Sequence, residues 1–242
     1  MQGEEKIKIN LPENQEKMKA DLLQGQLFVF DLDGTLVDAF YDITDAVNYA
    51  LDTLGFLQLS TNKVRQYVGN GLHKLMERVL KDVAEASGKR EPLPGVEEAA
   101  NLWKEYYLAH PADKARLYPG VLEFLNFLKK HSKIMAVFTN KNHEIAEKVL
   151  TKMGLMNYFK EVMGENGRFP RKPEPGGLFF LMEKYSALPA QTWMIGDGEP
   201  DIGVARAAGC RLCGVSYGNL GASKLSQYGV RFIVDSLEKI LQ

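Results

Sequence analysis

The chain has 242 residues, of which 45% are hydrophobic and 25% charged, the composition of a globular protein with a substantial core. Its 30 basic and 31 acidic residues leave a formal net charge of −1, so no overall positive field attracts nucleic acid or an anionic membrane. No apolar run approaches the roughly 20 residues of a membrane-spanning helix, and Cys210 and Cys213 alone exclude a disulfide framework. We therefore expect a cytoplasmic protein without nucleic-acid or membrane partners.

The first segment, residues 1–24, is charged and has little apolar periodicity, so we predict an N-terminal leader without a catalytic role. Ordered structure is predicted to begin at Leu27-Phe28-Val29-Phe30, a short apolar run that ends abruptly at Asp31. Continuous apolar runs of this length are typical of strands buried on both faces of a parallel sheet.

The next segment carries apolar residues at helical spacing. Ile43, Val47 and Leu51 repeat in this way, Leu72 opens a second series, and a third helix is predicted over residues 96–108. No convincing strand lies between these helices. We predict a helical cap domain, residues 40–114, inserted after the first strand.

Beyond the insertion, strand-like runs alternate with helical patterns. The runs lie at residues 134–138, 192–195, 211–215 and 231–234, and the helical patterns at 121–130, 143–153, 177–185, 201–208 and 223–228. This alternation indicates an α/β fold with a Rossmann-like parallel sheet. Residues 25–39 and 115–242 are predicted to form this core.

Polar residues follow three of the apolar runs. The three strand ends read Asp31-Leu32-Asp33-Gly34, Thr139-Asn140, and Gly196-Asp197 with Asp201 four residues later. Ligands of an open parallel sheet bind beyond the carboxyl ends of its strands. A single aspartate there usually caps the next helix, but four aspartates at two strand ends repel one another unless a cation lies among them. Hard carboxylate oxygens favour Mg²⁺.

Two further features suggest chemistry at these strand ends. Asp31 and Asp33 are two residues apart, so in extended backbone their side chains face the same pocket. One carboxylate can then attack while the other carries a proton. Lys172, in Arg171-Lys172-Pro173, would by itself be a residue of a solvated loop, but beside an anion site it is a candidate phosphate clamp.

Together these motifs resemble those of the haloacid dehalogenase superfamily of phosphotransferases, and they occur in the family's order. The matching segments are Asp31 to Asp38, Thr139-Asn140, Lys172-Pro173, and Gly196-Asp197 with Asp201. The resemblance covers about residues 25–235, and the helical insertion corresponds to the family's small mobile cap. Within the superfamily the chain is most similar to phosphoglycolate phosphatases, on Leu36-Val37-Asp38, Ala46-Val47-Asn48 and residues 64–71.

The resemblance implies Mg²⁺-dependent hydrolysis of a small phosphorylated metabolite, with 2-phosphoglycolate favoured, through a covalent aspartyl-phosphate. Asp31 would be the nucleophile, and Asp33 would protonate the leaving alkoxide and then activate water. Mg²⁺ would be held by the carboxylates of Asp31 and Asp197 and by the backbone carbonyl of Asp33. Asp201 would hold a metal-bound water or orient Lys172.

The same resemblance implies how the substrate is bound. Thr139 and Lys172 would act on the phosphoryl oxygens during catalysis, with Asn140 beside them. A small anionic leaving group also needs a basic partner in the cap, for which Arg65 is our candidate, with His73 and Lys74 nearby. The alternative interpretation is that Arg65 and Lys74 are solvated helix charges.

Several alternatives stay open at this point. The same core would also suit a pyrophosphatase, a nucleotidase, a sugar-phosphate phosphatase or a phosphomutase, whereas Asp33 and Thr139 argue against a dehalogenase. A non-catalytic member acting as a binding module is a different class, and the intact set of Asp31, Lys172 and Asp197 argues against it. The sequence indicates neither the oligomeric state nor the physiological phosphomonoester.

Overall fold

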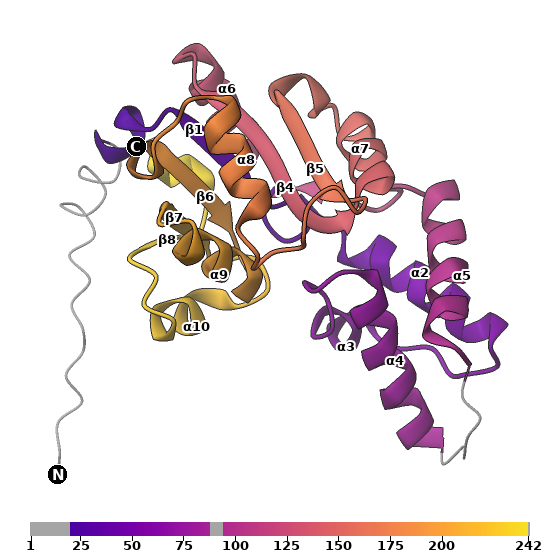
Figure 1. Cartoon of the computed structure of the whole chain (residues 1–242). Coiled ribbons are helices and arrows are strands. Elements are labelled where there is room, and N and C mark those ends of the chain that lie inside the picture. Colours follow the sequence, from indigo (N-terminus) through magenta and orange to yellow (C-terminus); the bar gives the residue numbers. More distant parts are fainter. Residues whose placement is uncertain (1–19, 88–93, 242) are drawn as a thin grey trace, which may run out of the picture.

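A six-stranded sheet lies at the centre of the chain, which is described by a computed structural model over residues 20–87 and 94–241. Its order is β5-β4-β1-β6-β7-β8, and every recorded pair of neighbouring strands in it is parallel (Figure 1). The strands are β1 (Leu27–Phe30), β4 (Ile134–Asn142), β5 (Glu161–Glu165), β6 (Thr192–Gly196), β7 (Arg211–Val215) and β8 (Phe232–Val234). The predicted α/β fold with a Rossmann-like sheet is confirmed, while most of the predicted leader lies outside the described residues.

Helices cover both faces of this sheet, which explains the unbroken apolar sequence of β1. Phe28 and Phe30 pack edge-on against Phe124 on one face, with ring centroids 6.5 and 6.2 Å apart. Leu27 and Val29 belong to a separate cluster on the other face. The helices of the core are α6 (Val121–Lys130), α7 (His143–Lys152), α8 (Gly176–Lys184), α9 (Glu199–Ala207) and α10 (Gly221–Gln227), with short 3₁₀ turns at Met156–Tyr158, Pro189–Gln191 and Leu237–Ile240.

Strand β5 was absent from the sequence prediction, and its environment explains why. It is an edge strand that pairs only with β4 among the described strands, and of its residues only Met163 is buried. Its two terminal glutamates and Gly164 remove the apolar signal by which the central strands were recognised. Strand β4 also runs to Asn142, past the predicted end at residue 138, with an irregular register between Phe138 and Asn142.

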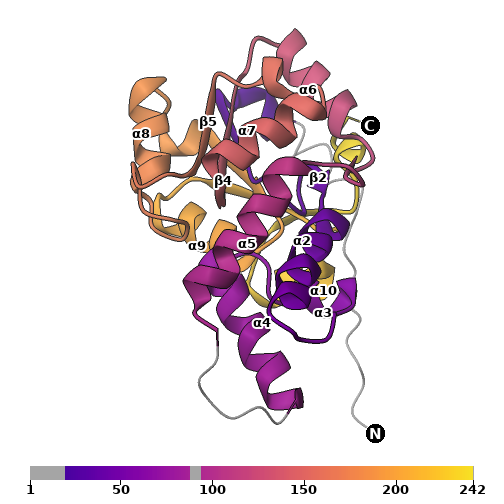
Figure 2. The ribbon, with the colours of Figure 1, turned by 90° about the vertical axis from the view of Figure 1, so that its right-hand side faces the viewer.

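The insertion after β1 consists of four helices that lie together at one side of the core (Figures 1 and 2). They are α2 (Phe40–Thr53), α3 (Thr61–Arg65), α4 (Leu72–Ser87) and α5 (Val96–Ala109). Helix α3 is additional to the three predicted helices, and we call α2–α5 the cap helices. A two-stranded antiparallel ladder, β2 (Val37–Asp38) with β3 (Arg116–Leu117), joins the two chain crossings between core and insertion. The domain division at residues 40 and 114 stays a prediction.

Candidate active site

Three strand ends meet at one edge of the sheet. The register pairs Phe30 of β1 with Val137 of β4 and with Ile195 of β6, so the carboxyl ends of these parallel strands lie at the same edge of the sheet, where β4 continues to Asn142. The backbone N–H of Asp31 still donates to the carbonyl of Ile195 at 2.9 Å, which holds this residue at the end of the strand. As a result, carboxylate oxygens of Asp31, Asp197 and Asp201 lie within 4.8 Å of one another.

The Asp197 carboxylate is held in place on both oxygens. The Thr35 hydroxyl donates to Oδ1 at 2.9 Å, and the backbone N–H of Asn219 donates to Oδ2 at 2.7 Å. Gly34 makes this approach possible, because its φ is +89° and a Cβ there would lie 2.4 Å from the Asp197 carboxylate. The glycine that follows Asp33 is therefore required both by the turn and by the close contact.

Lys172 joins two of the clustered carboxylates. Its Nζ lies 2.9 Å from Asp31 Oδ1 and 2.6 Å from Asp201 Oδ1, and the lysine is almost completely buried. The other Asp201 oxygen accepts hydrogen bonds from the backbone N–H groups of Asp197 and Gly198 at the start of α9. Asp201 therefore orients the Lys172 ammonium toward Asp31, one of the two roles predicted for it.

The site has more negative charge than Lys172 can balance. Burial, and then the charges of Asp31 and Asp201, raise the pKa of Asp197 to about 8. Burial also raises the pKa of Asp201 to about 6, although the Lys172 ammonium acts against this. Three buried or half-buried oxygen ligands with an unbalanced negative charge fit Mg²⁺. The predicted contact of the Asp33 backbone carbonyl with the metal stays a prediction.

These pKa values predict a pH-dependent stability. Without metal, the folded chain binds more protons at Asp197 and Asp201 than the unfolded chain, whose aspartates titrate near 3.8. The free energy of unfolding should therefore fall as pH rises from about 4 to about 8. Mg²⁺ binds the ionised carboxylates, so the shift in melting temperature on adding Mg²⁺ should grow over this range.

Thermal melts of wild type and Asp197→Asn, each in EDTA and in Mg²⁺ between pH 5 and pH 8, measure both effects. The difference between wild type and Asp197→Asn at each pH isolates the part of the pH dependence that requires Asp197. A Mg²⁺ shift that is independent of pH, or that persists unchanged in Asp197→Asn, would contradict the assignment.

Thr139 and Asn140 lie beside this cluster, but Asn140 is already engaged. Its Oδ1 accepts from the Lys172 N–H at 2.8 Å, and its Nδ2 donates to the carbonyls of Lys172 and of Gly69 in the cap. Asn140 thus holds the Lys172 backbone against the insertion. Thr139, like Asp31, lines the cavity that lies between the strand ends and the cap helices. The predicted contacts of Thr139 and Asn140 with a phosphoryl group stay predictions.

The basic cap residues named from the sequence make other contacts in the structure. The Arg65 guanidinium donates to the backbone carbonyls of Tyr217 and Gly218 at 3.3 and 3.0 Å, and so joins α3 to a loop of the core. His73 contacts Glu97 and Lys74 contacts Glu77, both exposed. None of the three lines the pocket. A substrate contact of Arg65 therefore stays a prediction.

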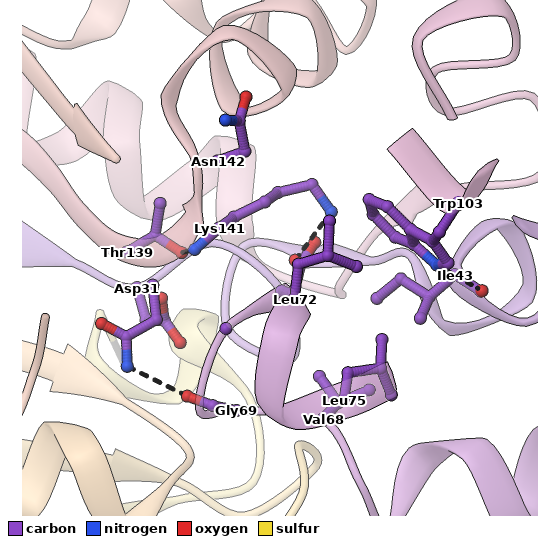
Figure 3. Close-up of a pocket in the computed structure, with 13 residues that line it drawn as sticks. Asp31, Ile43, Val68, Gly69, Leu72, Leu75, Trp103, Thr139, Lys141 and Asn142 are labelled. Carbon is purple, nitrogen blue, oxygen red and sulfur yellow. Dashed lines mark hydrogen bonds and ion pairs between the residues drawn. The ribbon is translucent and has the colours of Figure 1, made fainter. Parts of the chain in front are cut away.

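A cavity of about 60 Å³ lies between the strand ends and the cap helices (Figure 3). Its core side carries Asp31, Asp33 and Thr139, whereas its cap side is apolar. The apolar side chains are those of Ile43, Val68, Leu72, Leu75 and Trp103. The volume admits a few water molecules or a small organic group.

Lys141 and Tyr107 belong to this site but were not predicted. Lys141 Nζ lies 2.8 Å from Asp33 Oδ2 and 3.2 Å from the Tyr107 hydroxyl. Burial raises the pKa of Asp33, against the opposing effect of Lys141. The available signal was a lysine directly after Thr139-Asn140. Tyr107 could be interpreted from the sequence only as a packing residue of a cap helix.

Comparisons with known proteins agree with this geometry. The sequence profile of the haloacid dehalogenase-like hydrolases matches residues 28–215. A phosphoglycolate phosphatase from Vibrio parahaemolyticus is 34% identical, over 90% of this chain and 95% of its own length. Phosphoglycolate phosphatase 1 from Pseudomonas aeruginosa is also 34% identical, over 89% of this chain and 78% of its own length.

The structure agrees with these sequence comparisons. A crystal structure described as a predicted phosphoglycolate phosphatase from Haemophilus somnus is similar with a TM-score of 0.85 and 32% identity, covering 90% of this chain and 97% of that one. Over the part of the chain that the structure describes, no helix is both long and apolar enough to cross a membrane. The chain belongs to the haloacid dehalogenase-like hydrolase family and is therefore an enzyme of the hydrolase class.

Proposed function

We propose that the chain is a Mg²⁺-dependent phosphatase that hydrolyses a small phosphomonoester, with 2-phosphoglycolate as the favoured substrate. The observation that carries this proposal is the position of Asp31, which is paired with Lys172, adjoins Asp197 and lines the small cavity between the strand ends and the cap helices. Two curated proteins that are 34% identical to the chain are phosphoglycolate phosphatases, and this similarity supports the proposed substrate.

The first half of the reaction transfers the phosphoryl group to the protein. An Asp31 oxygen attacks phosphorus, the bond from phosphorus to the ester oxygen breaks, and Asp33 donates a proton to the departing alkoxide. Lys172 is placed to neutralise charge on the phosphoryl oxygens, since its ammonium already contacts Asp31. Thr139 lines the same space and offers a hydroxyl donor.

The second half releases phosphate. Asp33, now ionised, accepts a proton from a water molecule that attacks phosphorus, and the bond between phosphorus and the Asp31 oxygen breaks. This regenerates both carboxyl groups. Mg²⁺, held by Asp31 and Asp197 with Asp201 close behind, would supply positive charge next to the transferring phosphoryl group.

The cavity supports a small leaving group. Its volume of about 60 Å³ and its apolar cap side suit a group of a few heavy atoms.

A substrate panel tests the proposal. With Mg²⁺ present, we expect the highest kcat/KM for 2-phosphoglycolate, and lower values for p-nitrophenyl phosphate, hexose phosphates, nucleoside monophosphates and pyrophosphate. Phosphate release is the measurement. A clear preference for one of the other compounds would overturn the assigned substrate, and absence of any phosphate release would favour a binding module instead.

A further inference from the structure

We propose that Lys141 is a positioning residue for Asp33, and that Tyr107 of the cap holds Lys141 in place for this purpose. The inference rests on the proposed function, because it takes Asp33 as the group that transfers the proton. It assigns a role to two residues that the reaction as described above leaves unused.

The first observation is a buried ion pair between two strand ends. Lys141 Nζ lies 2.8 Å from Asp33 Oδ2, and the two side chains are only 5% and 12% exposed. Asp33 follows β1 and Lys141 lies near the end of β4, so the pair joins neighbouring parallel strands directly at the cavity. At such burial, removal of one partner leaves the other charge without compensation.

The ion pair leaves the two carboxylate oxygens of Asp33 in different environments. Oδ2 is held by Lys141, whereas Oδ1 is buried and has no hydrogen-bond partner among the described residues. A buried carboxylate oxygen without a partner is costly unless a ligand or water completes it. With Oδ2 fixed, the carboxylate plane is restricted, and Oδ1 is the atom left for a proton shared with the ester oxygen or with water.

The second observation is that the cap fixes the lysine. The Tyr107 hydroxyl accepts from Lys141 Nζ at 3.2 Å, and the same Nζ lies 4.3 Å from the centroid of the Tyr107 ring. Tyr107 is fully buried and stacks on Trp103 at 4.6 Å between ring centroids. Figure 3 shows the Lys141 side chain extending across the pocket toward Trp103. Aromatic faces of this kind stabilise a desolvated ammonium.

These contacts connect the seating of the cap to the orientation of Asp33. Lys141 and Asp33 belong to the core, whereas Tyr107 is part of α5. When the cap helices are positioned as in this structure, Tyr107 contacts the Lys141 ammonium, and this ammonium in turn holds the Asp33 carboxylate. Proton transfer by Asp33 is thereby favoured when the cavity is covered and bulk water is excluded.

A different role for Lys141 makes a different prediction. Lys141 is the only lysine or arginine among the described residues that line this cavity, so it could instead bind an anionic leaving group directly. Loss of an anion-binding residue would affect 2-phosphoglycolate alone. Loss of a positioning residue for the general acid would lower kcat/KM for every ester with an alkoxide leaving group, and would spare kcat/KM for p-nitrophenyl phosphate, whose leaving group needs no proton. The kcat values would fall for all esters if activation of water by Asp33 became the slow step, so kcat/KM is the quantity that discriminates.

The experiment measures kcat and KM for three esters in wild type and Lys141→Met. These are 2-phosphoglycolate, 2-hydroxyethyl phosphate, which has a neutral leaving group of similar size, and p-nitrophenyl phosphate. We expect kcat/KM to fall by roughly 100-fold for both alkyl esters, mainly through kcat, and by less than about 5-fold for the aryl ester. Lys141→Arg, which keeps the charge, should recover most of the loss.

Two further variants separate this role from a structural one. Tyr107→Phe keeps the ring and removes the hydroxyl, and is expected to show the same substrate pattern with a loss of about 5-fold. In an Asp33→Asn background, Lys141→Met should cause no further loss, because its effect passes through Asp33. Tyr106→Phe on the same helix and Lys148→Met on α7 are matched controls, expected to behave as wild type.

Three results would overturn the inference. A loss of kcat/KM confined to 2-phosphoglycolate would make Lys141 an anion-binding residue, and an equal loss of kcat/KM for all three esters would make its role structural. Additive losses in the Asp33→Asn background would show that Lys141 does not act through Asp33. If wild type prefers another substrate, the assigned substrate fails, but the comparison of alkyl with aryl esters still decides the role of Lys141.

Discussion

Replacement of Asp31 by asparagine is expected to lower phosphatase turnover by at least about 10⁴-fold without unfolding the chain. An amide oxygen is a poor nucleophile and cannot form the acyl-phosphate. The fold should tolerate the change, because Asp31 is one of the charges that raise the pKa of Asp197. In EDTA, the melting temperature of Asp31→Asn should therefore equal or exceed that of wild type.

The measurement is phosphate release by a sample whose mass confirms that the asparagine has not reverted to aspartate. Asp235→Asn is a matched control, because Asp235 forms an exposed ion pair with Lys239 and neither residue lines the cavity. Wild-type turnover by verified Asp31→Asn would remove Asp31 from the nucleophile role. A large decrease in the melting temperature of Asp31→Asn would instead show that Asp31 is needed mainly for the stability of the fold.

Exhaustive chelation is expected to lower turnover by at least about 1000-fold, and added Mg²⁺ should restore it. The reason is electrostatic. Among the residues that the structure describes, the clustered carboxylates of Asp31, Asp197 and Asp201 have one ammonium within contact distance, that of Lys172. Without a divalent cation, the excess negative charge would repel a phosphate dianion from its attack position.

Chelation followed by titration with Mg²⁺ gives the concentration at half-maximal rate, with ionic strength held constant by KCl as the control. Asp197→Asn should require a much higher Mg²⁺ concentration than wild type. Full activity after complete removal of divalent cations would refute the metal site. Activity restored by KCl alone would show that simple charge screening is sufficient.

The predictability of the fold differs between its centre and its edge. The run Leu27–Phe30 has its predicted bounds because each of its residues is buried between two helical layers, and this leaves a continuous apolar signal. Strand β5 gave no such signal because it lies at the edge of the sheet, and β2 and β3 gave none because each has two residues at a crossing point. Their existence depends on neighbouring strands rather than on their own side chains.

The site shows the same distinction. Asp31 and Asp197 could be predicted because each follows an apolar run that ends at the edge of the sheet, and Lys172 because of the Lys172-Pro173 motif. The contact between Lys141 and Tyr107 joins residues 34 positions apart and depends on how α5 seats against the core, which no local pattern encodes. Arg65 was expected near the substrate because of its charge and its place in the cap close to the Gly69-Asn70-Gly71 turn. In the folded chain, backbone carbonyls of Tyr217 and Gly218 bind that charge.

The ladder of β2 and β3 has a consequence for how this enzyme can diverge. Val37 lies opposite Leu117 and Asp38 opposite Arg116, so the chain leaves and re-enters the α/β layers at a single point. To those layers the insertion is equivalent to one long hairpin loop. The entropy of closing a loop rises only with the logarithm of its length. The ladder is therefore a natural grafting point, where one lid can replace another and redirect substrate choice while the phosphoryl-transfer machinery is inherited unchanged.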